Sequence, residues 1–288
     1  MHSAEIETYA VAPGQSLVAS SEKESRKVFI RDFRSGQEKG VLERPDPVTT
    51  LAWNRSGDLL AVAHNDASVS LLKWPGGDEV SQLKIPKEVM KLYEKPLKKI
   101  SLVRISPNAS TLAVICGQGE LMSWILKEDS AKVNIHHVSR FWDALFSPDG
   151  GHLAAVGSTF SLEMHADGRN LQFSSINSML WVGEVGSDRT WKVTSTNDIY
   201  EKVFWTSSGN EILVYATRPS PDGDTPKLLL VFLKESLMRG SSSSMAELKI
   251  GKGGLLAAGS FNADESQFFA NLEDNRIHVF DLEFRNRE

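Results

Sequence analysis

The sequence predicts an all-β fold built from repeated antiparallel sheets, and three observations support this prediction. A turn-centred motif recurs along the 288 residues, a further β-branched or aromatic segment follows each copy, and helix signals are nearly absent. A repeat of this kind determines the architecture, because each copy contributes the same structural unit.

The clearest copy of the motif is residues 146–154, FSPDGGHLA, an apolar strand end, a tight turn and an apolar strand start. Proline fixes φ near the value of a type I turn, and Asp, Asn and Gly tolerate the positions that follow, so each copy predicts a β-hairpin. The other copies are at 11–17, 53–61, 105–113, 205–213 and 261–269. The first two strands of six units are therefore predicted.

Two further strands are predicted in most units. Period-two alternation and Val, Ile, Leu and Phe content indicate third strands at 27–32, 68–72, 120–125, 178–182, 227–233 and 276–281. Weaker patterns indicate fourth strands at 38–42, 80–85, 132–138, 190–194 and 245–250. Only residues 87–95 have the pattern of a short helix.

The spacing of the units predicts a β-propeller. Equivalent positions at Leu17, Leu60, Leu112, Leu153, Leu213 and Phe269 are 43, 52, 41, 60 and 56 residues apart, which is the size of a four-stranded propeller blade. We expect one domain, 1–288, of six blades with approximate bounds 4–45, 46–86, 99–138, 139–195, 198–250 and 254–283.

The last blade is expected to be incomplete, because only residues 283–288 follow its third strand. A closed ring with a three-stranded final blade, an open ring and a piece of a longer propeller are all compatible with this. We favour the closed ring. The first two arrangements leave an exposed strand edge that a partner strand could extend.

Residues 274–281, DNRIHVFD, resemble the third-strand motif of the WD-repeat family, with Phe280 in place of the tryptophan. Trp124 and Trp181 stand at the corresponding place in two other units, and Asp66 matches the turn aspartate in a third. The resemblance covers nearly the whole chain and implies a WD-repeat propeller that binds proteins. We expect Trp53, Trp124, Trp181 and Trp205 to pack between blades, as large aromatic side chains usually do.

Composition restricts the partner class. The 32 basic and 37 acidic residues give a net charge of −5 and a pI near 5.9, so no global cationic field favours nucleic acid or anionic lipid. The single cysteine, Cys116, excludes an internal disulfide, and its apolar strand favours a packed thiol. With no apolar signal segment and no membrane span, we expect an intracellular protein, cytoplasmic or nuclear, of unknown oligomeric state.

The connections predict a binding face. In an antiparallel meander, the second-to-third connection and the inter-blade connection leave the sheet at the same end. The unusual segments are an inserted hairpin at 160–173, a Pro-rich loop at 217–226 and a lysine-rich inter-blade segment at 84–99, and all three should project from that face. The candidate contacts with a protein partner are Lys91, Tyr93, Met164, His165, Asp167, Arg169, Arg218 and Asp222.

No residue is assigned a catalytic, cofactor-binding or metal-binding role, and we expect no enzyme activity and no cofactor. The alternative is a hydrolase or lactonase-like propeller enzyme with a small-molecule site in the axial channel, where the innermost strands supply Asp143 and Glu201. The lysine-rich segment has six lysines against two glutamates, yet it lacks the interleaved aromatic residues of a nucleic-acid site. The favoured function is a protein-interaction scaffold.

Overall fold

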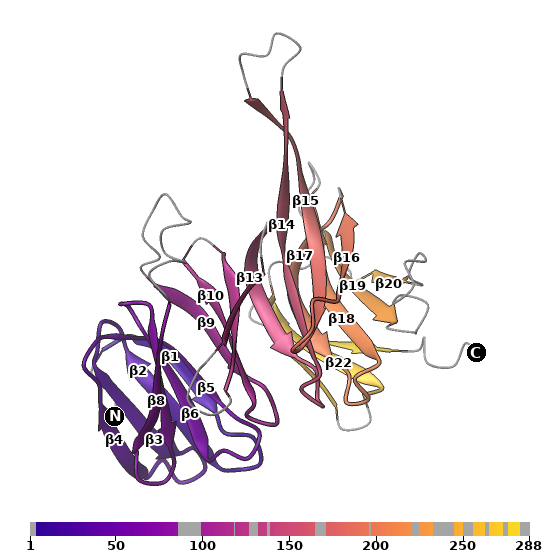
Figure 1. Ribbon diagram of the computed structural model, residues 1–288. Coiled ribbons are helices and arrows are strands. Elements are labelled where there is room, and N and C mark those ends of the chain that lie inside the picture. Colours follow the sequence, from indigo (N-terminus) through magenta and orange to yellow (C-terminus); the bar gives the residue numbers. More distant parts are fainter. Residues whose placement is uncertain are drawn as a thin grey trace. The chain divides into compact units, whose positions relative to one another are not determined.

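Figure 1 shows the computed structural model of the chain, coloured from the N-terminus to the C-terminus. The structure describes residues 4–85, 99–117, 119–126, 132–136, 139–164, 171–195, 197–219, 225–232, 245–249, 256–262, 265–272 and 276–282. The chain divides into two compact units, Met1–Arg140 and Phe141–Glu288, and each is described by itself. The short helix expected at 87–95 lies outside the described residues.

Unit 1 contains three four-stranded antiparallel sheets in which sequential strands are neighbours. The first is β1 (Ile6–Val11), β2 (Leu17–Glu22), β3 (Lys27–Asp32) and β4 (Glu38–Glu43). The second is β5 (Val48–Trp53), β6 (Leu59–His64), β7 (Ser68–Lys73) and β8 (Glu79–Lys84). The third is β9 (Ile100–Ile105), β10 (Thr111–Cys116), β11 (Leu121–Ile125) and β12 (Lys132–His136).

Unit 2 repeats this arrangement, with β13 beginning at the junction between the units. Its first sheet is β13 (Ser139–Phe146), β14 (His152–Met164), β15 (Leu171–Glu184) and β16 (Thr190–Ser195). Its second is β17 (Ile199–Trp205), β18 (Glu211–Arg218), β19 (Thr225–Phe232) and β20 (Met245–Lys249). Its third is β21 (Leu256–Phe261), β22 (Gln267–Leu272) and β23 (Ile277–Asp281).

The all-β prediction and the strand assignment are confirmed. Every described sheet is a meander whose strands coincide, within a few residues, with the predicted ones, and the last sheet has three strands among the residues that the structure describes. One element differs: of the inserted hairpin expected at 160–173, residues 160–164 continue β14 and residues 171–173 continue β15 without a break. The number of blades in the ring, its closure and the single-domain organisation stay predictions.

One turn geometry recurs in the hairpins between first and second strands. In the 147–150 turn, the Gly150 amide donates to the Ser147 carbonyl (2.9 Å), and the Ser147 amide donates to the His152 carbonyl (2.9 Å). The residue at the Gly150 position has a positive φ in five sheets, at Gly57, Ala109, Gly150, Gly209 and Glu265. Glycine is therefore the least strained residue at this position.

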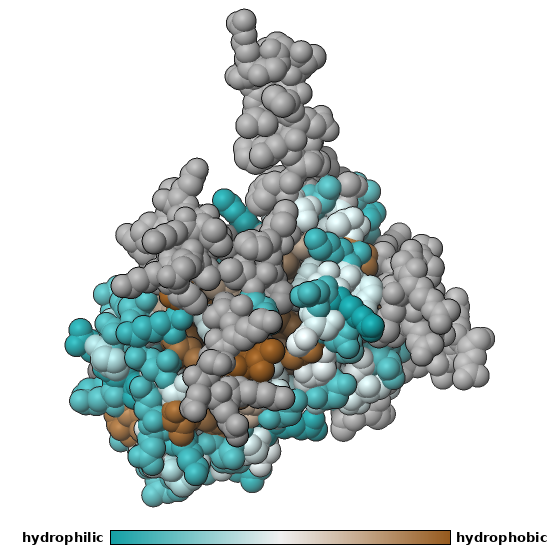
Figure 2. All heavy atoms as spheres, in the orientation of Figure 1, coloured by the Kyte–Doolittle hydropathy of each residue, from teal (hydrophilic) through white to brown (hydrophobic). Residues whose placement is uncertain are grey.

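Neighbouring sheets within each unit pack face against face. In unit 1, one apolar cluster joins the first and second sheets, and another joins the second and third. In unit 2, two apolar clusters join the corresponding pairs of sheets. The four tryptophans predicted as core are buried, at 7% exposure or less. In Figure 2, most of the described surface on the visible face is hydrophilic, as expected when the apolar side chains lie between sheets.

Two indole N–H groups connect equivalent positions of neighbouring sheets. Trp53 in β5 donates to the carbonyl of Ala10 in β1 (3.2 Å), and Trp205 in β17 donates to the carbonyl of Leu145 in β13 (2.9 Å). Each tryptophan ends the first strand of its sheet, and each acceptor is the penultimate residue of the preceding first strand. The same contact in two places indicates that the repeats are structurally equivalent.

Cys116 is a packed thiol, as predicted. Its side chain is 1% exposed at the end of β10, and burial raises the pKa of the thiol to about 12. Within the described ranges, no helix is long and apolar enough to span a membrane, and no group of three or more His, Cys, Asp or Glu side chains is placed to hold a metal ion.

Candidate functional site

Both long second-to-third connections of unit 2 leave from the same end of their sheets. Ser195 at the end of β16 lies opposite Ser178 in β15, and Ile199 at the start of β17 lies opposite Thr217 in β18. Only residues 196–198 join β16 to β17. In the first sheet, one end carries the β14–β15 connection. This end therefore lies beside the end of the second sheet that carries the β18–β19 connection, as predicted.

The lysine-rich segment of unit 1 also leaves at this type of strand end. Lys84, in the last position of β8, lies opposite Ser68, and Ile100, in the first position of β9, lies opposite Cys116. The hydroxyl of Thr49 donates to the Ile100 carbonyl (2.8 Å), and the Lys99 ammonium pairs with Glu7 of β1 (2.7 Å). The predicted end is thus confirmed within each unit, while a face shared by all three segments stays a prediction.

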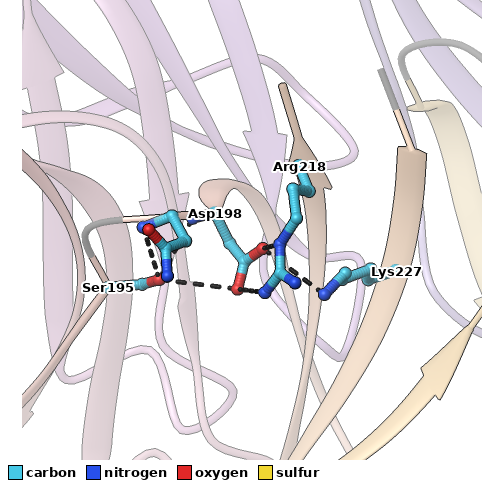
Figure 3. Close-up of polar contacts among 5 residues, drawn as sticks. Ser195, Asp198, Arg218 and Lys227 are labelled. Carbon is cyan, nitrogen blue, oxygen red and sulfur yellow. Dashed lines mark hydrogen bonds and ion pairs between the residues drawn. The ribbon is translucent and has the colours of Figure 1, made fainter. Parts of the chain in front are cut away.

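The carboxylate of Asp198 contacts two cationic side chains at this end of unit 2. Arg218, the last residue of β18, donates from Nε to Oδ1 (2.8 Å) and from a terminal nitrogen to Oδ2 (3.1 Å). Lys227 of β19 places Nζ 3.6 Å from Oδ1. Figure 3 shows both cations converging on the carboxylate from neighbouring strands. We call these three residues the Asp198 bridge.

Burial makes the members of the Asp198 bridge unequal. The side chain of Lys227 is 2% exposed and that of Asp198 is 10% exposed, whereas that of Arg218 is 46% exposed. A bidentate guanidinium–carboxylate pair fixes orientation as well as distance, because two parallel hydrogen bonds must be satisfied together. The bridge therefore ties the β16–β17 connection to the base of the β18–β19 connection.

The connection from β16 to β17 is itself ordered by Ser195. The Ser195 hydroxyl accepts the backbone amides of Asn197 (3.3 Å) and Asp198 (3.1 Å), which is a short side-chain-stabilised turn. Tyr200, two residues beyond Asp198, is 2% exposed. Burial chiefly raises the pKa of its phenol, and the Asp198 charge adds to the increase.

Among the eight predicted contact residues, Arg218 is the one whose side chain the structure describes, and it lies at the predicted end. Met164 is the last residue of β14 and pairs in register with Leu171. The others lie outside the described residues: Lys91, Tyr93, His165, Asp167, Arg169 and Asp222. Their part in a binding surface stays a prediction.

Asp198, Ser195 and Lys227 were not among the residues predicted from the sequence. The STND segment at 195–198 has the hydroxyl and amide-capturing pattern of a turn, which could have pointed to Ser195. Lys227 begins a strongly apolar run in a predicted strand, and a lysine in that position signals a buried partner. The sequence could not identify Asp198 as that partner, because Asp198 and Lys227 are far apart along the chain.

The carboxylates considered for an axial catalytic site have structural hydrogen bonds. Asp143 of β13 is 6% exposed, and its Oδ2 accepts the amide of Val203 in β17 (3.2 Å). Glu201 accepts the hydroxyl of Thr217 (2.6 Å). Asp143 therefore connects two neighbouring sheets, and Glu201 connects two strands of one sheet.

Comparisons with known proteins agree with the fold. Residues 24–94 match the family model of the anaphase-promoting complex subunit 4 WD40 domain. No curated protein sequence matches the chain.

Solved structures resemble the chain over almost its full length. Hydrazine synthase from Kuenenia stuttgartiensis is similar with a TM-score of 0.73 and 16% identity, over 98% of this chain and 80% of that one. The β-propeller domain of Cps50 (Swd1) from Myceliophteria thermophila is similar with a TM-score of 0.64 and 14% identity, over 98% of this chain and 84% of that one. With the repeated sheets, these likenesses show that the chain has a β-propeller fold, and the family match over residues 24–94 is to a WD40 domain.

Proposed function

We propose that the chain is a non-enzymatic scaffold that binds a protein partner through the end of its sheets that carries the second-to-third connections. The observation that carries this proposal is the concentration of elaboration at that end of unit 2. There, β14 and β15 extend well beyond β16, and the Asp198 bridge fixes the base of the neighbouring β18–β19 connection. Elaborated connections on a rigid scaffold are the usual location of binding residues.

The family match supports the same class of function. The matching family model is named for a subunit of a multiprotein complex, so its WD40 domain works within an assembly. We extend that role to this chain: its partner is a protein that contacts the β14–β15 extension and the region around Arg218.

The experiment that tests this proposal trims the β14–β15 extension. Phe160 and Ile176 are paired in register, so residues 161–175 can be replaced by Asn-Gly, which forms a two-residue hairpin turn. Affinity capture from the source cells, followed by mass spectrometry, compares this variant with the unchanged chain. The matched control is Arg189→Ser, because Arg189 is exposed on the β15–β16 turn at the opposite end of the same sheet.

We expect the trimmed variant to lose partners that the Arg189→Ser variant retains. Recovery of every partner by the trimmed variant would contradict the proposal. Equal loss in both variants would also contradict it, because binding would then involve the opposite end.

The alternative function, a propeller enzyme with an axial small-molecule site, draws support from the likeness to hydrazine synthase. It requires a chemical role for Asp143 or Glu201 in addition to their structural hydrogen bonds. Titration of the purified chain with Zn²⁺, Mn²⁺ or Ca²⁺, followed by calorimetry, separates the two functions. A tight site that Glu201→Gln abolishes would favour the enzyme.

A further inference from the structure

The β14–β15 pair forms a two-stranded arm beyond the rest of its sheet. The pairing of β15 with β16 ends at Ser178 opposite Ser195, whereas the pairing of β14 with β15 continues to Met164 opposite Leu171. Figure 1 shows the two strands projecting past the strands beside them. A two-stranded ribbon is marginally stable in water by itself, so an arm of this length gains from a third strand.

The register places apolar residues on one face of the arm. The opposed pairs Phe160 and Ile176, Leu162 and Phe173, and Met164 and Leu171 alternate with polar pairs along the ladder. Directly opposed residues share a face, and successive residues alternate between faces. A bulge at Ser174 adds one residue to β15, and this brings Phe173 and Leu171 onto the same face as Ile176.

That face continues the packed face of the sheet below it. Val156 and Leu180 are opposed in register, as are Ala154 and Val182, and all four belong to the apolar cluster shared with β17, β18 and β19. These positions are an even number of residues from Phe160 on β14 and from Ile176 on β15, so they share its face. The apolar row of the arm therefore extends from the side of the first sheet that faces the second.

The outer edge of β15 along 171–177 is suited to strand addition. In the part of the chain that the structure describes, no strand pairs with these residues on the side away from β14. Proteins usually protect such an edge with lysine, other charges or proline. The segment LQFSSIN contains none of them.

We propose that this edge binds an extended peptide segment of a partner protein, which adds as a strand in line with β16 and extends the apolar face with its own alternating apolar residues. The proposal rests on the proposed function and specifies its mode of binding. Main-chain hydrogen bonds to β15 give affinity, and the apolar row selects a peptide with an apolar residue at every second position. The sequence between β14 and β15 contains His165, Asp167 and Arg169, which disfavours insertion into lipid.

The experiment uses the purified full chain and synthetic peptides. The probe is the peptide Thr-Val-Thr-Ile-Thr-Val-Thr, fluorescently labelled, with a block-ordered peptide of the same composition as reference. Two further versions are N-methylated at alternate residues, one at the odd positions and one at the even positions. Each register of N-methylation removes the donors that one edge of a strand presents. Fluorescence anisotropy measures each affinity.

The matched protein variants are two neighbouring cross-strand pairs on opposite faces of the arm. Leu162→Thr with Phe173→Thr changes the apolar face, and Glu163→Thr with Gln172→Thr changes the polar face. Threonine keeps the β preference in both. We expect the apolar-face variant to weaken peptide binding at least tenfold, the polar-face variant to change it less than threefold, and N-methylation in one of its two registers to abolish it.

Several results would overturn the proposal. These are equal binding of the alternating and block-ordered peptides, equal effects of the two double variants, or binding that N-methylation leaves unchanged in both registers. Dimerisation of the chain that the apolar-face variant abolishes, measured by sedimentation, would identify a second copy as the occupant instead. The peptide assay needs no natural partner. A negative peptide result would therefore refute strand addition without deciding the outcome of the arm-trimming experiment.

Discussion

The Asp198 bridge allows a prediction in which two individually damaging substitutions partly compensate. Asp198→Ala removes the carboxylate that lies 3.6 Å from the Lys227 ammonium, whose side chain is 2% exposed. Breaking a buried ion pair from one side costs about 3–5 kcal/mol, since the remaining charge stays buried. Asp198 is 10% exposed, so we expect the lower end, a loss of about 3 kcal/mol in the free energy of unfolding.

Urea denaturation of three further variants tests the cause of this loss. Arg218→Ala removes the 46% exposed partner and should cost about 1 kcal/mol or less. Lys227→Met removes the buried charge and keeps the apolar stem. Asp198→Ala combined with Lys227→Met should therefore recover about half of the loss caused by Asp198→Ala alone. Additive losses, or an Asp198→Ala loss no larger than that of Arg218→Ala, would refute the reasoning.

Three other predictions follow from turns and packing. Ala109 has a φ of 54°, so Ala109→Gly should raise the free energy of unfolding by about 1 kcal/mol in the same urea assay. Gly209 stands at the equivalent position with a φ of 70°, so Gly209→Ala should lower the free energy of unfolding by about as much. Trp205→Phe should cost about 1–2 kcal/mol in that assay, because the carbonyl of Leu145 loses its indole donor. Cys116 should resist iodoacetamide at pH 9 in the folded chain and react after denaturation, since its thiol pKa is about 12; rapid alkylation of the native protein, followed by mass spectrometry, would contradict this.

The fold could be predicted from the sequence because the relevant signals are local. The Ser147-Pro148-Asp149-Gly150 turn and its relatives determine hairpins within a few residues, and strand alternation extends them. The burial of Trp53 and Trp205 also followed from their repeated place in the motif. Each of these inferences needed only short-range spacing and the equivalence of the units.

The parts that could not be predicted depend on register between distant residues. Asp198 meets Arg218 and Lys227 only because β18 and β19 have a particular pairing that brings their ends to the β16–β17 connection. The bulge at Ser174 changes which face Leu171 and Phe173 occupy, and no turn residue marks it. The arm was recognised as a hairpin, but its apolar face required the register.

The central claim is that the second-to-third connections of neighbouring sheets lie at one end and the third-to-fourth turns at the other. Electron–electron distance measurements between spin labels test it in unit 2, with Pro219→Cys paired in turn with Thr194→Cys and Ser187→Cys. All three sites are exposed, and the native Cys116 is buried. Position 194 is near the end of β16 (Thr190–Ser195) and position 187 precedes its start, and a strand rises about 3.3 Å per residue. The claim therefore predicts a clearly shorter distance from position 219 to position 194 than to position 187. Equal distances, or the reverse order, would contradict it.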